Sequence, residues 1–572
     1  MGEIYFKAER VLIWLGESTF ESEAAIRYLH DVYVLLEPVV VGLASRGQLA
    51  VPRRGLEAVQ PNILEAIRRR RDEFQEQNRQ RYHREGVTEA NMLTELMDRR
   101  WFQRMWMLQE LVMARSATFL CGESEISWAK LSLALGALVV YDQSPELTGM
   151  NEANYAPRLK LYQDLRTQVH QHMSPIRTDF VGFTMSWVLT LGRPLQCSKP
   201  KDKMYGLHGY LRALGFMDLP RVDYGKSVPE VFTEYTRAAM LHDLSAELLY
   251  EVGSAKDAPP AFESPGGIAR LPSWVADWSS SRCCAQVNHE HFAASGASQL
   301  TFEFPGPGRL RLSGVVIDTV RACSETVPQR PEQRLNDLME PGVYLPSMEQ
   351  RVRAWVSWLR MALGEGEYPT GERTVDVFQR TILQDGAVGK LPEHRLPAEV
   401  MDEASSWVSL LAVHDEDVPP GNGASAYQLE SHELWRHRVN EVLEYTLTLP
   451  AFHAAYFSSP GVDPRPILAN PGFRTMTALA NGGPMRAHNW ILRLTTGRRM
   501  FRTQLGYFGT APQSIRTGDS VALIAGMKLP MLVRALEDGD GYKLVCPAFV
   551  HGMMHGEFWP AHEGALSEFV FN

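Results

Sequence analysis

The residues most able to do chemistry lie in one short stretch, Arg100–Glu110. If this stretch is helical, Trp106 and Glu110 lie four residues apart on one face, while Met105 and Leu108 share a face that can pack on a sheet. A carboxylate beside an indole is suited to general acid/base catalysis or to stabilising an oxocarbenium ion. We therefore take Glu110 as the candidate catalytic residue.

A purely structural role for the same residues stays open. Glu110 can form an ion pair with Arg104 or Arg115, and the tryptophans can belong to a hydrophobic core. Periodicity alone does not separate the two interpretations, because ion pairs that only stabilise a fold are more common than catalytic carboxylates.

Two histidine clusters have residue types that bind metals, but their surroundings favour structural roles. His551, His555 and Glu557 lie among glycines, which favour a strand and a turn over a metal-binding helix. A second cluster lacks the spacing of a tetrahedral zinc site and is expected in a surface loop. It comprises Cys283, Cys284, His289 and His291. We predict no metal site.

A cysteine and a run of arginines have residue types that could be functional, but their surroundings also favour structural roles. Cys197 and His208 could act as nucleophile and base, but the residues between them indicate a loop that enters a helix. Arg68–Arg71 could bind nucleic acid, yet Asp72 and Glu73 follow at once, which favours a solvated helix with internal salt bridges. We expect no nucleic-acid partner.

Several strong catalytic signatures are absent from the sequence. It contains no Gly-x-x-x-x-Gly-Lys-Ser/Thr, no Gly-x-Gly-x-x-Gly after a strand, no His-Glu-x-x-His and no Gly-x-Ser-x-Gly. Ordinary P-loop NTPases, Rossmann dehydrogenases, zincins and α/β-hydrolases are therefore excluded.

The elements that must position Glu110 form an α/β pattern. Val11–Leu15 reads as a buried strand closed by Gly16, and Ser22 can cap the helix that follows. Strand and helix then alternate as in an open α/β sheet. The further expected elements are a charged helix over 62–85, a helix from Trp101 to Ala114, a strand at Ala117–Cys121 and a helix capped by Ser127.

The remaining sequence predicts three more regions. Residues 1–135 contain the α/β part, 136–300 a helical extension, 301–480 a mainly helical variable region and 481–572 a small β domain. Short apolar runs separated by glycine-rich turns predict that this last domain is a small antiparallel sheet or barrel. The runs are Trp490–Leu494, Met500–Thr503, Ser520–Ile524, Met531–Arg534 and Tyr542–Val545.

Length and composition indicate how many domains the chain has and where it is located. The chain has 572 residues, a net charge of -9 and 45% hydrophobic residues, which fits several ordinary packed domains. Its 6 cysteines are scattered rather than arranged as a disulfide framework, so a reducing, cytoplasmic location is expected. No apolar stretch reaches the ~20 residues of a membrane span.

Together the motifs resemble the fungal heterokaryon incompatibility (HET) domain family. The N-terminal resemblance rests on Glu3, Ile4 and Tyr5, on the strand that ends at Gly16, and on the Trp101–Glu110 block. Downstream and C-terminal segments also resemble those of the family, in the same order. They are Lys201–Leu207, Asp223 and Tyr224, Leu271–Trp278, Gly518 and Asp519, Arg534, and Gly552–Glu557.

The resemblance implies a fold and an activity. HET cores resemble Toll/interleukin-1 receptor (TIR) domains, which have a flavodoxin-like α/β fold and in some members cleave NAD with a helical glutamate. By this resemblance Glu110 is the catalytic residue, Trp106 lines the nicotinamide pocket, and Trp101 and Arg104 help to bind the substrate. NAD is then a substrate rather than a cofactor.

The family pattern also suggests how the protein works in the cell. It implies a self/non-self recognition protein that triggers regulated cell death, with other incompatibility proteins as partners and with possible self-association. Two strands that usually open the family domain do not occur before Val11, so we expect a shortened, incomplete α/β core. The alternatives are a non-catalytic adaptor and a hydrolase that acts through Glu110 on another glycosidic substrate.

Overall fold

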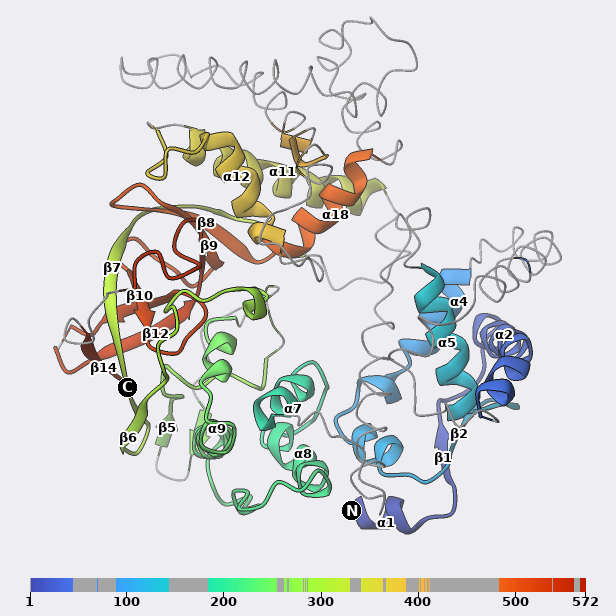
Figure 1. Cartoon of the computed structure of the whole chain (residues 1–572). Coiled ribbons are helices and arrows are strands. Elements are labelled where there is room, and N and C mark those ends of the chain that lie inside the picture. The colour runs from blue at the N-terminus through green and yellow to red at the C-terminus, as the bar shows by residue number, and fades with distance from the viewer. Residues whose placement is uncertain are drawn as a thin grey trace, which may run out of the picture. The chain divides into compact units, whose positions relative to one another are not determined.

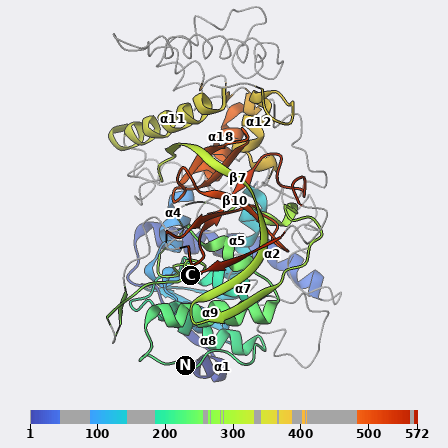
Figure 2. The same cartoon turned by 90° about the vertical axis from the view of Figure 1, so that its left-hand side faces the viewer.

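The structure is a computed structural model of the chain (Figures 1 and 2). It describes residues 2–44, 89–142, 184–254, 262–264, 267–280, 286–329, 341–363, 367–386, 483–537, 539–559 and 566–572, together with residues 69, 282, 284, 401, 403–405, 407, 408 and 411. The chain forms two compact units, Met1–Gly225 and Lys226–Asn572, and each is described by itself.

Unit 1 is an α/β unit. Helices surround a small three-stranded sheet, and a second group of helices follows in the sequence. Its elements are α1 (Gly2–Lys7), β1 (Val11–Trp14), α2 (Phe20–Ala44), α4 (Glu89–Met97), η1 (Arg100–Gln103), η2 (Leu108–Val112), β2 (Ala117–Cys121), β3 (Ser124–Ser127), α5 (Trp128–Asp142), α7 (Met185–Gly192) and α8 (Asp202–Ala213).

The sheet of unit 1 has the order β1-β2-β3. β1 and β2 are parallel, with Val11 opposite Ala117, and β3 pairs antiparallel with β2. A helix between two parallel neighbours is the expected crossover, which confirms the predicted α/β character of this unit. The strand at Val11 exists as predicted, but it is buried on one face only: Leu12 and Trp14 are 55% and 52% exposed.

The start of α2 corrects one predicted cap. The helix begins at Phe20, and the Ser22 N–H donates to Thr19 Oγ1 at 3.2 Å while the Thr19 N–H donates to Ser22 Oγ at 2.8 Å. Thr19 is therefore the cap, and Ser22 reciprocates from the first turn in the manner of a capping box. The predicted cap of α5 is confirmed, because Ser127 Oγ accepts the Lys130 N–H at 3.4 Å.

Unit 2 contains the C-terminal β structure and the helices that cover part of it. Its elements are α9 (Val228–Asp243), η3 (Glu247–Glu251), β4 (Phe262–Ser264), β5 (Gly267–Ala269), η4 (His289–His291), β6 (Phe302–Gly306), β7 (Arg309–Thr326), α11 (Pro341–Leu363), α12 (Thr374–Ile382), η5 (Gln384–Gly386), α18 (Gly483–Thr495), β8 (Arg498–Thr503), β9 (Phe508–Pro512), β10 (Ser520–Ile524), β11 (Met531–Ala535), β12 (Tyr542–Pro547), β13 (Phe549–Val550) and β14 (Ser567–Phe571).

The 18-residue strand β7 organises this unit. It pairs with β14 and with β10, and the strands β10, β11, β12 and β14 are paired in that order. The five strands thus close into a ring, which fits the predicted small barrel and removes open edges. The second half of β7 pairs with β8, which carries β9 and β13. No strand is predicted from the sequence at 302–326, so β6 and β7 are strands that the sequence pattern did not indicate.

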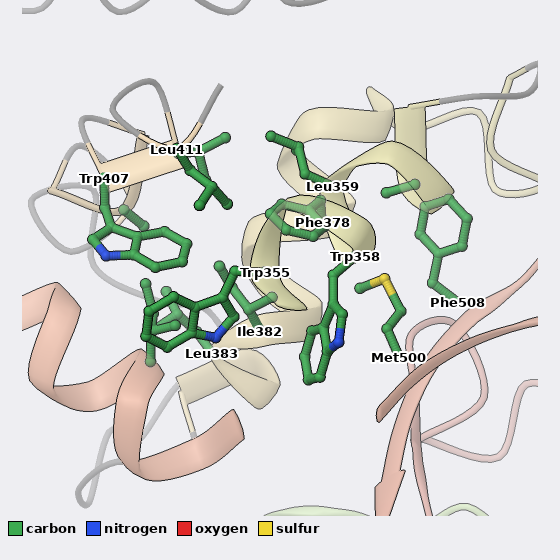
Figure 3. Packing of buried hydrophobic residues seen from close by; sticks show 14 of the residues in the cluster. Trp355, Trp358, Leu359, Phe378, Ile382, Leu383, Trp407, Leu411, Met500 and Phe508 are labelled. Carbon is green, nitrogen blue, oxygen red and sulfur yellow. The ribbon is translucent and has the colours of Figure 1, made fainter. Parts of the chain in front are cut away.

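Helices α11, α12 and α18 lie together beside β8 and β9 (Figures 1 and 2). Figure 3 shows the core that they form with Met500 and Phe508 of these strands. Trp355 packs edge-to-face on Trp407 at 5.1 Å, and its Nε1 donates to Thr495 Oγ1 at 3.0 Å. The indoles of this core therefore satisfy their polar group while they fill space, as buried tryptophans require.

Four of the five predicted C-terminal strands are confirmed, and one prediction is wrong. Residues 490–494, expected as a strand, belong to helix α18. Ala487, Ile491 and Leu494 are buried at three- and four-residue spacing, so the helical period decides the conformation. The charged helix expected over 62–85 lies outside the described residues except for Arg69.

Among the helices in the described part of the chain, none has both the length and the apolar character that crossing a bilayer demands.

A buried ion pair beside the barrel generates the first prediction. Asp519 is 1% exposed, and Arg534 donates from Nε to Oδ1 at 2.6 Å and from Nη2 to Oδ2 at 2.9 Å. We expect Asp519→Asn to lower the free energy of unfolding by about 3 kcal/mol, because it leaves the guanidinium without its counter-charge.

The matched control is the exposed pair of Arg309 and Asp540, whose side chains are 42% and 68% exposed. Asp540→Asn should cost less than about 1 kcal/mol. Urea denaturation followed by tryptophan fluorescence compares the two variants. Equal midpoints would contradict the assignment of Asp519 as the stronger support.

Candidate active site around Trp101 and Glu110

The segment that carries the candidate residues is not the continuous helix that the sequence predicts. It consists of the 3-10 helix η1 and the π-helix η2, with an extended residue, Arg104, after η1. The backbone there hydrogen-bonds elsewhere: the Met105 N–H donates to Gln196 O at 2.8 Å, and the Gln196 N–H donates to Gln103 O at 2.6 Å. The expected helix Trp101–Ala114 is therefore wrong, because tertiary hydrogen bonds replace the helical ones. Short π-helices of this kind are frequent at functional sites.

Glu110 accepts a hydrogen bond from an indole, and the indole is that of Trp101. Trp101 Nε1 donates to Glu110 Oε2 at 2.6 Å. Trp101 is 6% exposed and packs edge-to-face on Phe102 and Phe119, with ring centroids 5.1 and 5.4 Å away. The donor is thus held rigidly, and it fixes one oxygen of a carboxylate that is itself only partly buried.

Trp106 lies one turn before Glu110, as the sequence spacing implies. Its carbonyl accepts the N–H groups of Gln109 at 3.0 Å and of Glu110 at 3.2 Å, and its side chain is partly buried. The turn therefore places Trp106 next to the glutamate in the chain, while the indole that contacts the carboxylate comes from nine residues earlier.

Tyr5 joins this site from α1, which packs against η2. Burial raises the pKa of the Tyr5 hydroxyl, the charge of Glu110 raises it further, and Arg104 lowers it in part. Tyr5 therefore lies within electrostatic reach of both residues. No sequence pattern indicated a chemical role for Tyr5. Only its place in the N-terminal motif marked it.

Helix α8 supports the segment from behind. Gln109 Nε2 donates to Gly206 O at 2.8 Å in a buried contact, and Met105 packs directly on Gly206. Lys203 is buried and donates to the carbonyls of Arg193, at 2.7 Å, and Leu195. This explains the Lys201–Leu207 motif structurally: its lysine holds the end of α7, and its glycine lets α8 approach the candidate site.

Among the other clusters that the sequence raised, Cys283 and all of Arg68–Arg71 except Arg69 lie outside the described residues. Cys197 Sγ donates to Lys199 O at 3.1 Å, and burial raises the pKa of this thiol, with Lys203 offsetting part of the effect. Burial, and then Arg212, lower the pKa of His208. A less acidic thiol is a poorer nucleophile. No group of three or more candidate ligands could hold a metal in the described part of the chain.

Two family models match the two units. The heterokaryon incompatibility protein (HET) model matches residues 1–110, which include Trp101 and Glu110, and the Het-6 beta-barrel domain model matches residues 475–566. Residues 1–110 of the α/β unit thus resemble the HET domain, and residues 475–566 resemble the Het-6 barrel, of heterokaryon incompatibility proteins. It is similar to Heterokaryon incompatibility protein 6, OR allele, of Neurospora crassa, with 23% identity over 97% of this chain and 78% of the relative. No solved structure matches the chain significantly.

The second prediction tests the support from α8. A Cβ on Gly206 would lie 2.4 Å from Met105 Cγ, so Gly206→Ala forces the η1–η2 segment to move. We expect a loss of about 1–3 kcal/mol in the free energy of unfolding.

Gly209, on the same helix, is the control, because a Cβ there would meet its nearest atom, Gln109 Nε2, at 3.5 Å. Gly209→Ala should be neutral or stabilise by up to about 1 kcal/mol, as alanine does within a helix. Thermal denaturation compares the stabilities of the two variants. Unchanged stability of Gly206→Ala would show that Met105 does not restrict the space next to Gly206.

Proposed function

We propose that this protein acts in heterokaryon incompatibility, the recognition of self and non-self, and that its α/β unit triggers cell death by cleaving NAD. The two family-model matches support the first part, as does the relative named a heterokaryon incompatibility protein, which aligns over 97% of the chain. The proposed partners are other incompatibility proteins, and the proposed location is the cytoplasm.

The hydrogen bond from Trp101 to Glu110 carries the catalytic part. It orients a partly exposed carboxylate at 2.6 Å while the indole excludes water from one side. In the proposed reaction the bond between the ribose C1′ and the nicotinamide nitrogen breaks, its electron pair leaves with nicotinamide, and the Glu110 carboxylate stabilises the ribosyl oxocarbenium ion or orients its hydroxyls. Water then adds to C1′ and releases one proton, which gives ADP-ribose.

The neighbouring residues fit the remaining parts of the substrate. Arg104 is exposed and supplies a guanidinium suited to the pyrophosphate. Trp106 offers an aromatic wall for nicotinamide. Tyr5, whose raised pKa keeps its hydroxyl protonated at neutral pH, offers a hydrogen-bond donor beside the carboxylate.

The proposal includes a TIR-like, flavodoxin-like fold for the α/β core within residues 1–135. The parallel pair β1 and β2 with α2 between them supports it, because this is the repeating unit of such folds. The helical extension at 136–300, the variable region at 301–480 and the β domain at 481–572 remain the proposed domain division.

A second candidate, a non-catalytic adaptor, is favoured by the open face of β1. Leu12 and Trp14 project from this end strand and are about half exposed, although both are large and apolar. Exposed apolar side chains next to a strand edge are common where another protein binds.

The third prediction separates the two candidates. Glu110→Gln keeps an oxygen for the Trp101 hydrogen bond but removes the negative charge, so it should lower NAD consumption at least about 100-fold without unfolding the protein. Trp101→Phe keeps the ring packing and loses the hydrogen bond, so a smaller loss of about tenfold is expected. Cellular NAD and viability after expression in a fungal host are measured together.

Glu123→Gln is the control, because Glu123 is an exposed carboxylate in the turn between β2 and β3. It should behave as the unchanged protein does. If Glu110→Gln kills as efficiently while NAD stays constant in every strain, the catalytic proposal fails and the adaptor is favoured.

A further inference from the structure

His551 lies in a closed ring of four charged side chains within unit 2. Its Nε2 is 2.8 Å from Glu372 Oε2, and its Nδ1 is 3.4 Å from Asp385 Oδ2. Arg380 completes the ring, with Nη1 at 2.7 Å from Glu372 Oε1 and Nε at 2.6 Å from Asp385 Oδ1. Every member therefore touches two others of opposite formal charge when the imidazole is protonated.

This charged group joins α12 and η5 to strands β9 and β13. His551 follows β13, and its backbone is fixed there because its N–H donates to Phe508 O at 3.0 Å. Arg380 belongs to α12, Glu372 to the turn before it and Asp385 to η5 after it. The contact of one imidazole with two carboxylates thus holds both ends of α12 against the strands.

Charge counting favours a proton on His551. Two carboxylates face one guanidinium, so the ring is neutral only when the imidazole is an imidazolium. Both ring nitrogens face carboxylate oxygens, and a neutral imidazole would turn a lone pair toward one of them. The His551 side chain is 5% exposed, so it is largely shielded from bulk water, and an imidazole there depends on its contacts with the carboxylates. Burial lowers the pKa of His551, but Asp385 and Glu372 outweigh burial and Arg380, so the pKa is raised.

The backbone of η5 has an unfavourable conformation that side-chain contacts must stabilise. Gln384 and Asp385 have φ of 49° and 51°, in the left-handed region that residues other than glycine rarely adopt. Asp385 is kept there by Arg380 and His551. Loss of the His551 proton therefore removes one of the two contacts that offset an unfavourable conformation.

The other groups around His551 do not compete for the same role. The Tyr368 hydroxyl donates to His551 O at 2.8 Å, and burial raises the pKa of Tyr368 and of Tyr507, so both stay neutral in the pH range of histidine. His555 and Glu557 lie at the exposed rim of the same cavity, which has a volume of about 430 Å³.

We propose that this ring of charged side chains is a pH-operated latch, closed when His551 is protonated and released when it loses its proton, which controls how firmly α12 and η5 are held against strands β9 and β13. The proposal is independent of the role of Glu110. Because the closed form binds the proton more tightly, the latch is fully engaged below the ordinary histidine pKa and is lost as pH rises through the raised pKa of His551.

Hydrogen exchange on the full chain tests the latch. Between the two pKa values, protection of the α12 amides relative to intrinsic exchange should fall up to about tenfold for each unit of rising pH, the limit for one linked proton. The amides of α9 serve as an internal reference. His551→Gln should abolish the dependence in α12, and His555→Gln, an exposed change on the same turn, should preserve it.

Glu372→Gln guards against a His551 variant that fails to fold. It removes one attracting carboxylate, so the pH at which α12 loses protection should shift downward. An unchanged pH dependence in His551→Gln, or an unshifted transition in Glu372→Gln, would overturn the latch.

Discussion

The backbone pairing of residues 103–105 with Gln196 is the constraint on which the candidate site depends. It takes the hydrogen bonds that a helix would need and leaves Arg104 extended between two short helical turns. The chain then folds back, so that Trp101 reaches Glu110 across nine residues rather than one helical turn. This site needs support from α8. Gly206 leaves room for Met105, and the buried Lys203 holds the carbonyls of Arg193 and Leu195, next to Gln196.

Unit 2 is organised by a different constraint, the length of β7. One strand is shared by the closed ring and by the β8–β9 pair, so a single alternating sequence fixes the register of both parts. Two charged groups then link elements of this unit: Asp519, in the turn before β10, pairs with Arg534 of β11, and His551, after β13, pairs with carboxylates on either side of α12.

Short sequence patterns predicted the elements that depend on neighbouring residues, but not the features that depend on contacts between distant parts of the chain. The strands at Val11 and Ala117 and the cap at Ser127 follow from neighbouring residues alone, and all three are confirmed. The residues at 490–494 look like a strand in isolation, but their burial follows a helical period that only the core defines. The residues next to Glu110 in the sequence marked it as a candidate. Its hydrogen-bond partner Trp101 could not be predicted, because the backbone pairing with the distant Gln196 determines where Trp101 lies.

The central claim is that the Glu110 carboxylate, oriented by Trp101, cleaves the glycosidic bond of NAD. The most direct measurement incubates the purified full chain with NAD and quantifies nicotinamide and ADP-ribose by chromatography. We expect both products to form in equal amounts and Glu110→Gln to release at least about 100-fold less of each. Nicotinamide release at the uncatalysed rate, or equal release by the unchanged protein and the variant, would contradict it.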